Sequence, residues 1–309
     1  MPAEAPALGS PAVYLVAAVT VLVLGLNWPI MGVGVGLIPP MWLTAIRLLG
    51  AGVLVGSALL VTGRLHRPDW SDYPILASVA VMRLALVYSL VFIGLSHVPP
   101  GRSFILVYTS ALWTAPLAAW LLKEHLTVLR LVGVGVGATG VVILVQPWSL
   151  SQNGDGATWG FGLLLMAAFF TAAGTVHIRG HRWTGSALAL MPWQLTAAGV
   201  LTTVVALVVE GLPSFPVDER VIGILLYQVV LASAFGVWGL LTIARSLPAV
   251  SASLLLMAVP VIGLLSSAVL VDEPLTLSVM LGMLLVLGGV AAGIVTDATK
   301  RPSDPSAAP

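Results

Sequence analysis

Long apolar stretches, separated by short polar segments, fill almost the whole chain. A helix needs about 20 apolar residues to cross the hydrocarbon core of a bilayer, and ten stretches approach that length. The first charge-free stretch is long enough for nearly two spans and is divided by Ile38-Pro39-Pro40. We predict an all-α integral membrane protein with ten transmembrane helices, at residues 12–33, 40–62, 73–95, 102–121, 129–146, 159–178, 187–209, 221–243, 249–271 and 277–296.

Composition excludes a water-soluble globular protein, because 59% of the residues are hydrophobic and only 8% are charged. The net charge of +1 gives no reason to expect a nucleic-acid partner. The absence of cysteine excludes disulfides and thiolate metal sites. We expect membrane lipid and a small-molecule substrate as partners, with no cofactor and no metal.

The distribution of Lys and Arg predicts the orientation in the membrane. With the N-terminus inside, only Arg102 and Arg220 fall in outside loops. The inside loops contain Arg64, Arg67, Lys123, Arg130, Arg179, Arg182, Arg245, Lys300 and Arg301. Because cytoplasmic loops carry the excess of Lys and Arg, we predict that both termini are cytoplasmic. The expected location is the bacterial cytoplasmic (inner) membrane.

The chain also repeats itself. Leu121–Val145, shifted by 149 positions, lies over Leu270–Ile294, and seven of the 25 positions match. The matches include an acidic turn, the Leu-Thr that follows it, and two glycines seven residues apart. A second register places Gly52 on Gly199. Similarity at a fixed spacing indicates a duplicated unit.

The duplication predicts the domain organisation. Five spans separate the two acidic turns, and an odd number places the turns on opposite sides of the membrane. The two halves are therefore predicted to be inverted five-helix repeats around a central cavity. The predicted parts are an N-terminal tail (1–11), repeat 1 (12–146), a linker (147–158), repeat 2 (159–298) and a disordered C-terminal tail (299–309).

The acidic turns and the glycine-rich spans after them resemble the EamA-type carriers of the drug/metabolite transporter (DMT) superfamily. The resemblance rests on KEHLTVLRLVG and DEPLTLSVMLG, on Arg47 in the second span, and on Pro260, thirteen residues before Glu273. Among these carriers, the pattern is most similar to bacterial amino-acid exporters of the aromatic-amino-acid type. In the first half Ala111 stands in place of Pro260, and Pro116 follows five residues later. The fourth span is therefore expected to bend at a different place from the ninth.

The resemblance implies that the first, third, fourth, sixth, eighth and ninth spans surround the cavity. Aromatic, amide and hydroxyl side chains at mid-depth in those spans suit a small amphipathic metabolite. The predicted substrate-binding set is Asn27, Trp28, Arg83, Tyr88, Tyr108, Trp113, Thr171, Tyr227, Gln228, Trp238 and Ser253. Gln228 and Trp238 are ten residues apart, nearly three α-helical turns, so they are predicted to share one stripe.

Ionisable residues inside a span are costly in lipid and are therefore candidates for function. Arg83 falls near the middle of the third span, where a guanidinium could bind a substrate carboxylate through two hydrogen bonds. Its alternative role is structural, either bonding to helix-end carbonyls or extending toward the membrane surface. Arg47, Glu124, Glu273 and Pro260 are predicted to be gating or structural residues, Arg47 because the resembling family commonly has an arginine there.

These features predict a secondary transporter that exports amino acids or related small metabolites by alternating access and acts as a monomer. Two other interpretations remain open: a carrier of another metabolite, such as a nucleotide sugar or a drug, and a non-transporting membrane receptor. An enzyme is not expected, because the sequence shows no cluster of His, Asp or Glu and no nucleophile paired with a base near an interface.

Overall fold

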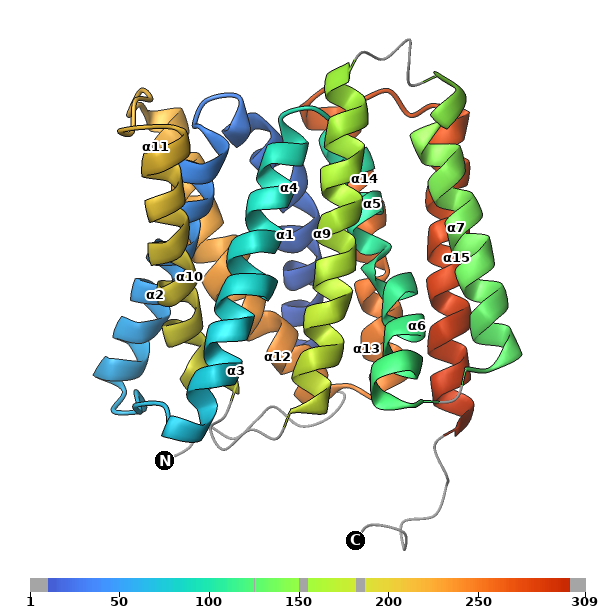
Figure 1. Cartoon of the computed structure of the whole chain (residues 1–309), viewed down its shortest axis with the longest axis horizontal. Helices are drawn as coiled ribbons and strands as arrows, with labels where there is room; N and C mark the ends of the chain where they lie inside the picture. Colours follow the sequence, from blue (N-terminus) through green and yellow to red (C-terminus); the bar gives the residue numbers. More distant parts are fainter. Residues whose placement is uncertain (1–10, 125, 150–154, 182–186, 301–309) are drawn as a thin grey trace, which may run out of the picture.

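The computed structural model describes residues 11–300, except residues 125, 150–154 and 182–186. All secondary structure in this part of the chain is helical. Within it, ten helical spans are long and apolar enough to cross a membrane (Figure 1), which confirms the predicted fold class and number of spans.

Six spans are single helices and four are built from shorter segments. The single helices are α1 (Pro11–Val35), α2 (Pro40–Val61), α7 (Val128–Val145), α9 (Asp155–Gly180), α10 (Ala187–Val209) and α15 (Leu277–Lys300). The third span consists of η1 (Trp70–Asp72), α3 (Tyr73–Ser78), η2 (Val79–Leu86) and α4 (Val87–Leu95), and the fourth of α5 (Pro100–Tyr108) and α6 (Ser110–Leu122). The eighth consists of α11 (Glu219–Leu226), η4 (Tyr227–Phe235) and α12 (Gly236–Ser246), and the ninth of α13 (Ala249–Leu256) and α14 (Ala258–Leu270). A short turn, η3 (Pro147–Ser149), follows the fifth span.

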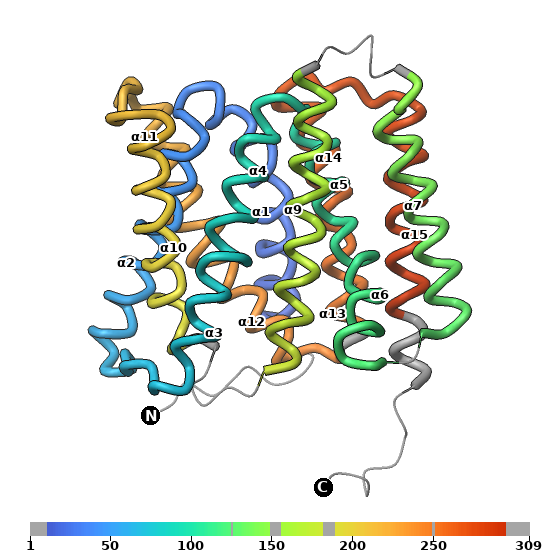
Figure 2. The backbone as a smooth tube through the Cα atoms, viewed as in Figure 1, coloured from blue at the N-terminus to red at the C-terminus, as the bar shows by residue number. Residues whose placement is uncertain are grey.

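Corresponding helices of the two predicted repeats run in opposite directions. In Figure 1, α1 begins at the lower edge of the molecule and α9 begins at the upper edge. In the tube of Figure 2, α7 and α15 lie side by side at one side of the molecule, and α2 and α10 pack together at the other. The lower edge carries the turn with Glu124 and the upper edge the turn with Glu273, and we name them the Glu124 end and the Glu273 end.

The predicted tails and linker fall largely outside the described residues. Residues 1–10, 150–154 and 301–309 are not among them. At the C-terminal side α15 continues to Lys300, which is two residues into the predicted tail. The described part of the linker contains η3 and the start of α9.

The largest buried apolar cluster lies toward the Glu273 end. It includes Trp28 near the end of α1, Trp42 near the start of α2, and Phe92 near the end of α4. A much smaller cluster, which includes Ala17 of α1 and Ile243 of α12, lies toward the Glu124 end. Burial of apolar surface is the main favourable term in packing, and the most extensive apolar packing among these clusters therefore lies toward the Glu273 end.

The fourth and ninth spans are broken at equivalent places. The breaks are at Thr109 (φ −61°, ψ −10°) and Met257 (φ −67°, ψ −15°), 148 residues apart. At each break the backbone N–H is shared between the carbonyls three and four residues earlier, which is a tightened helical turn. The expectation that the two spans bend at different places is therefore wrong. Pro116 lies inside α6, which continues without a break, and the tight turn at Thr109 makes the bend instead.

The third and eighth spans each contain a π-helical segment. η2 begins at Val79 and η4 begins at Tyr227, 148 residues later. In a π-helix the backbone hydrogen bond joins residues five apart, so residues i and i+5 lie about one turn apart. The predicted stripe of Gln228 and Trp238 is wrong, because most of the residues between them belong to η4. Gln228 is 0% exposed, whereas Trp238 is 51% exposed.

The glycines that match between the two halves lie where the halves pack together. A Cβ at Gly133 of α7 would lie 2.7 Å from the carbonyl oxygen of Gly289 of α15. A Cβ at Gly140 would lie 2.8 Å from the carbonyl oxygen of Gly282. Small residues of this kind let two membrane helices approach closely. The matched pair at the other side of the molecule, Gly52 and Gly199, likewise marks the α2–α10 contact.

Candidate functional site

One buried arginine, Arg47, and the side chains around it form a cluster in the half of the molecule nearer the Glu273 end, which we name the arginine cluster. Arg47 is the eighth residue of α2, about 10 Å from the start of that helix, and is 4% exposed. Its Nη1 donates to the side-chain oxygen of Gln228 at 2.7 Å, and its Nε donates to Ser233 Oγ at 3.1 Å. The guanidinium carbon lies 4.8 Å from the ring centroid of Tyr88, and Nη1 lies 3.4 Å from Met31 Sδ. Arg47 therefore joins α1, α2, α4 and η4.

The π-helical turn of η4 brings both hydrogen-bond acceptors to Arg47. Gln228 and Ser233 are five residues apart, which would place them about 140° apart around an α-helix. In η4, Ser233 Oγ donates to the carbonyl oxygen of Gln228 at 2.7 Å, so the two residues lie one turn apart. Within the described residues no Asp or Glu forms an ion pair with Arg47. Amide, hydroxyl and aromatic groups stabilise its charge instead.

Two buried polar atoms near this cluster have no hydrogen-bond partner in the part of the chain that the structure describes. They are Asn27 Oδ1 and Gln228 Nε2. Asn27 is 7% exposed, and its Nδ2 donates to Met31 Sδ at 2.9 Å, which places it beside the arginine cluster. A buried polar atom without a hydrogen bond costs free energy in apolar surroundings. One acceptor and one donor therefore remain available to a ligand or an ordered water.

Arg83 occupies a different environment, in η2 at the middle of the third span. It is partly exposed, and it forms no hydrogen bond or ion pair with any residue that the structure describes. Its aliphatic portion packs over Gly174 of α9, since a Cβ there would lie 2.8 Å from Arg83 Cδ. Thr171, one turn before Gly174, has a buried hydroxyl with no partner in the same part of the chain. The guanidinium keeps its N–H donors available beside a helix that also offers a hydroxyl.

Aromatic side chains from three spans pack inside the molecule. Trp28 stacks on Phe104 with ring centroids 4.6 Å apart and an interplanar angle of 13°. Phe104 meets Tyr108 edge to face at 6.0 Å. The Tyr227 hydroxyl donates to the carbonyl oxygen of Val23 at 2.7 Å, which ties η4 to α1. Predicted residues Trp28, Tyr108 and Tyr227 therefore lie in the interior, where they hold helices together.

Other predicted residues do not join the arginine cluster. Trp113 is 41% exposed and packs edge to face against Phe169 of α9 at 5.9 Å. Trp238 is more than half exposed, and Ser253 is partly buried on α13. Pro260 is buried inside α14. The structure thus divides the predicted substrate-binding set into buried residues around Arg47 and in the aromatic interior, Arg83 and Thr171 on η2 and α9, and more exposed residues on α6, α12 and α13.

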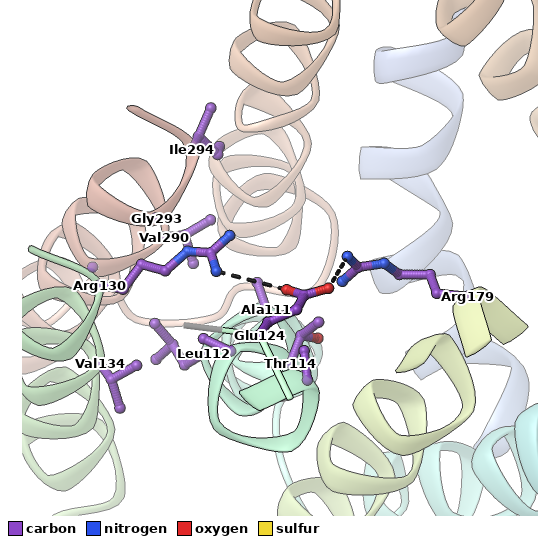
Figure 3. A pocket seen from close by; sticks show the side chains of 13 residues that line it. Ala111, Leu112, Thr114, Glu124, Arg130, Val134, Arg179, Val290, Gly293 and Ile294 are labelled. Carbon is purple, nitrogen blue, oxygen red and sulfur yellow. Dashed lines mark hydrogen bonds and ion pairs between the residues drawn. The ribbon is translucent and has the colours of Figure 1, made fainter. Parts of the chain in front are cut away.

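A cavity of about 150 Å³ opens at the Glu124 end, between α6, α7, α9 and α15 (Figure 3). Glu124 lies at its centre, between two arginines. Its Oε1 accepts a hydrogen bond of 2.5 Å from Arg179 Nη2, and its Oε2 lies 3.8 Å from Arg130 Nη1. From the sequence, both arginines are predicted only as basic loop residues, because their pairing with Glu124 depends on how α7 and α9 approach α6.

Glu273 makes a different contact at the opposite end. Its carboxylate accepts hydrogen bonds from the backbone N–H groups of Gly101 at 2.7 Å and Arg102 at 3.1 Å, at the start of α5. Glu273 is 5% exposed. Burial raises the pKa of its carboxyl above the ordinary value of 4.5, opposed by the two backbone hydrogen bonds and by the charge of Arg102. The carboxylate caps a helix start, where free N–H groups favour a negative charge.

The EamA-like transporter family matches this sequence twice, at residues 11–146 and at residues 158–294. One match lies in each predicted repeat, and together they cover most of the chain. The chain belongs to the EamA-like transporter family. It is a multi-pass membrane transporter of the DMT superfamily, and the family predicted from the acidic turns is confirmed.

Relatives of this transporter match over most of their length. An uncharacterized transporter of Bacillus subtilis (strain 168), YvbV, is 25% identical over 277 residues, which is 89% of each chain. Proteins named "Probable amino-acid metabolite efflux pump" are 26% identical in Escherichia coli (strain K12) and 28% identical in Salmonella typhimurium (strain LT2). Each of the two covers 89% of this chain and 92% of its own length. A solved crystal structure covers 95% of this chain and 99% of its own at 19% identity, with a TM-score of 0.64, so it shares the fold.

Proposed function

We propose that this EamA-family transporter is an inner-membrane carrier that exports amino acids or related small carboxylate-bearing metabolites by alternating access. The observation that carries the proposal is the state of Arg83. It lies at the middle of a membrane span, is partly exposed, and has no hydrogen-bonding partner among the described residues. A guanidinium with unused N–H donors at that depth suits a carboxylate, which it binds through two parallel hydrogen bonds.

The two-fold construction of the chain supports alternating access. The family matches each half, and the first helices of the two halves run in opposite directions. Inverted repeats provide two nearly equivalent packings of one half against the other, one open to each side of the membrane. The helix breaks at Thr109 and Met257, at equivalent places in the two halves, supply positions where the fourth and ninth spans can change direction.

The substrate class and the location draw on the relatives and on charge. Two bacterial relatives carry the name amino-acid metabolite efflux pump. The excess of Lys and Arg in the loops predicted to be inside supports cytoplasmic termini. The Glu124 end would then face the cytoplasm and the Glu273 end the outside.

Transport by the purified protein in liposomes tests this function. Efflux of a panel of labelled amino acids is compared among wild type, Arg83→Ala and Arg83→Lys, with Arg220→Ala as a matched control at an exposed arginine at the start of the eighth span. Loss of a charge-assisted contact should reduce saturable flux roughly 10- to 100-fold in Arg83→Ala. Arg83→Lys keeps the charge but loses the planar guanidinium with its parallel N–H donors, so its flux should lie between those of wild type and Arg83→Ala. Arg220→Ala should transport like wild type.

The alternatives give different results in the same assay. Flux that survives Arg83→Ala, with the protein folded, would make Arg83 a structural residue. Flux of a nucleotide sugar or a drug, with none for amino acids, would replace the substrate class. No flux for any compound would favour a non-transporting receptor.

A further inference from the structure

The two acidic turns of the repeats share a left-handed residue before the glutamate and have different partners. Glu124 and Glu273 are 149 residues apart. Each directly follows a residue in the left-handed conformation, Lys123 with φ 56° and Asp272 with φ 54°. The turns therefore share this local feature, whereas their carboxylates have different partners.

Glu273 joins two elements at the Glu273 end. By bonding two N–H groups of α5, its carboxylate ties the turn after α14 to the start of the fourth span. The contact lies at the end that also holds the largest apolar cluster. Gly101 leaves room for it, since a Cβ there would lie 2.9 Å from Glu273 Oε2.

The second half of the chain contains a helix start, that of α13, which is equivalent to the start of α5 capped by Glu273. α5 follows Pro99 (φ −53°, ψ 144°), and α13 follows Pro248 (φ −54°, ψ 143°), 149 residues later. The positions equivalent to Gly101 and Arg102 are therefore Val250 and Ser251, at the start of α13. A residue other than glycine at the first position does not exclude a cap, because Glu210 accepts a hydrogen bond from Met41 N–H at the same place in α2. Here Glu124 bonds arginines at the Glu124 end instead (Figure 3).

We propose that Glu273 and Glu124 are alternating latches of this transporter. In the state seen here, Glu273 caps α5 and Glu124 is held by Arg179 and Arg130. In the opposite state, Glu124 leaves the arginines and caps α13 at the Glu124 end, while Glu273 releases α5. The arginine contact thus stabilises the present state, and the cap at α13 stabilises the other. This inference rests on the alternating access proposed above and deepens it by assigning the contacts that exchange.

A third carboxylate provides a matched control. Glu210, at the end of α10, accepts hydrogen bonds from the N–H groups of Met41 at 2.9 Å and Trp42 at 3.1 Å, at the start of α2. Its chemistry is the same as that of Glu273. The position 148 residues earlier is Thr62, which has no carboxylate. Glu210 therefore has no acidic counterpart in the other half and is a static cap.

A single introduced thiol reports opening of the Glu273 end. The chain has no cysteine, and Ser103, just inside the capped turn of α5, is 0% exposed. The rate at which a maleimide labels Ser103→Cys in detergent therefore measures access to this buried position. Glu273→Ala should raise that rate about tenfold, because both hydrogen bonds of the cap are lost. Glu210→Ala should change it less than about twofold, since its cap does not exchange.

The decisive substitution lies at the opposite end of the molecule. Arg179→Gln frees Glu124 to cap α13, so it should also raise labelling of Ser103→Cys, by roughly three- to tenfold. In the Glu124→Gln background, Arg179→Gln should have no effect. If Arg179→Gln leaves the rate unchanged, or raises it equally without Glu124, the latch is refuted. An equal increase in Glu210→Ala and Glu273→Ala would also refute it, because the effect would be general loosening.

The labelling experiment needs no substrate, so it fails or succeeds independently of the substrate assignment. If Arg179→Gln raises the labelling rate but the protein transports no amino acid, the latch is supported and the proposed substrate is wrong. If the protein transports amino acids but Arg179→Gln leaves the labelling rate unchanged, the transport function is supported and the latch is wrong.

Discussion

Arg47 of α2 and Gln228 of η4 form a hydrogen bond of 2.7 Å that joins the two halves of the chain inside the membrane-spanning region. Both side chains are almost fully buried. In apolar surroundings a guanidinium is costly unless its donors are used. The bond therefore fixes α2 against η4 in the half where the largest apolar cluster closes the molecule.

Arg47→Lys should destabilise the protein by about 2–3 kcal/mol. A single ammonium cannot reproduce the two-armed contact with Gln228 and Ser233, so at least one buried acceptor loses its partner. Arg83→Ala should cost less than about 1 kcal/mol, because Arg83 has no hydrogen bond to lose among the described residues. Thermal unfolding of the purified variants in one detergent measures both. An equal loss in the two variants would contradict the separate roles assigned to the two arginines.

Gly289→Ala should destabilise the α7–α15 contact by about 1–3 kcal/mol. The new Cβ would meet the carbonyl oxygen of Gly133 and the backbone of Gly137, at 2.9 Å from its nitrogen. The matched control is the adjacent Gly288→Ala, where nothing lies within 4 Å of the new Cβ. That variant should be neutral or slightly more stable, because alanine favours a helix over glycine. Thermal unfolding compares the pair, and a cost at Gly288 equal to that at Gly289 would rule out the close approach as the cause.

Acidification should favour the state in which the Glu273 end is closed. The pKa of Glu273 is raised by burial in this state and should return toward 4.5 when the carboxyl is exposed. The closed state therefore binds more protons between pH 4.5 and the raised pKa, so a fall in pH through that window favours it. Each unit of difference in pKa changes the ratio of the two states by up to about tenfold.

The distance between spin labels at His97→Cys and Leu275→Cys, both exposed at the Glu273 end, measures this shift. His97 and Asp272 line the same depression of about 410 Å³ as Glu273, and Arg102 lies beside it. Replacing His97 also removes its side chain from this depression. A pH-dependent shift that remains in Glu273→Gln would assign the effect to another group.

Much of this fold could be predicted from the sequence because a membrane helix is recognised from the length and hydrophobicity of a single segment. The ten apolar stretches and the matched glycines are properties of single segments, and each has its expected place in the structure. The π-helical turns were missed, since no residue type marks them, and they rotate Gln228 and Trp238 onto different faces. The partners of Arg47 and Glu124 were missed as well, because such pairs depend on how distant helices approach one another.

Counterflow in liposomes tests the central claim most directly. Liposomes containing the purified protein are preloaded with an unlabelled amino acid that showed saturable flux, and uptake of the same labelled amino acid from outside is measured. A carrier with alternating access exchanges bound substrate faster than it returns empty, so preloading should accelerate uptake and produce a transient accumulation of label. Flux without any acceleration by preloading would contradict alternating access and indicate a continuous pore.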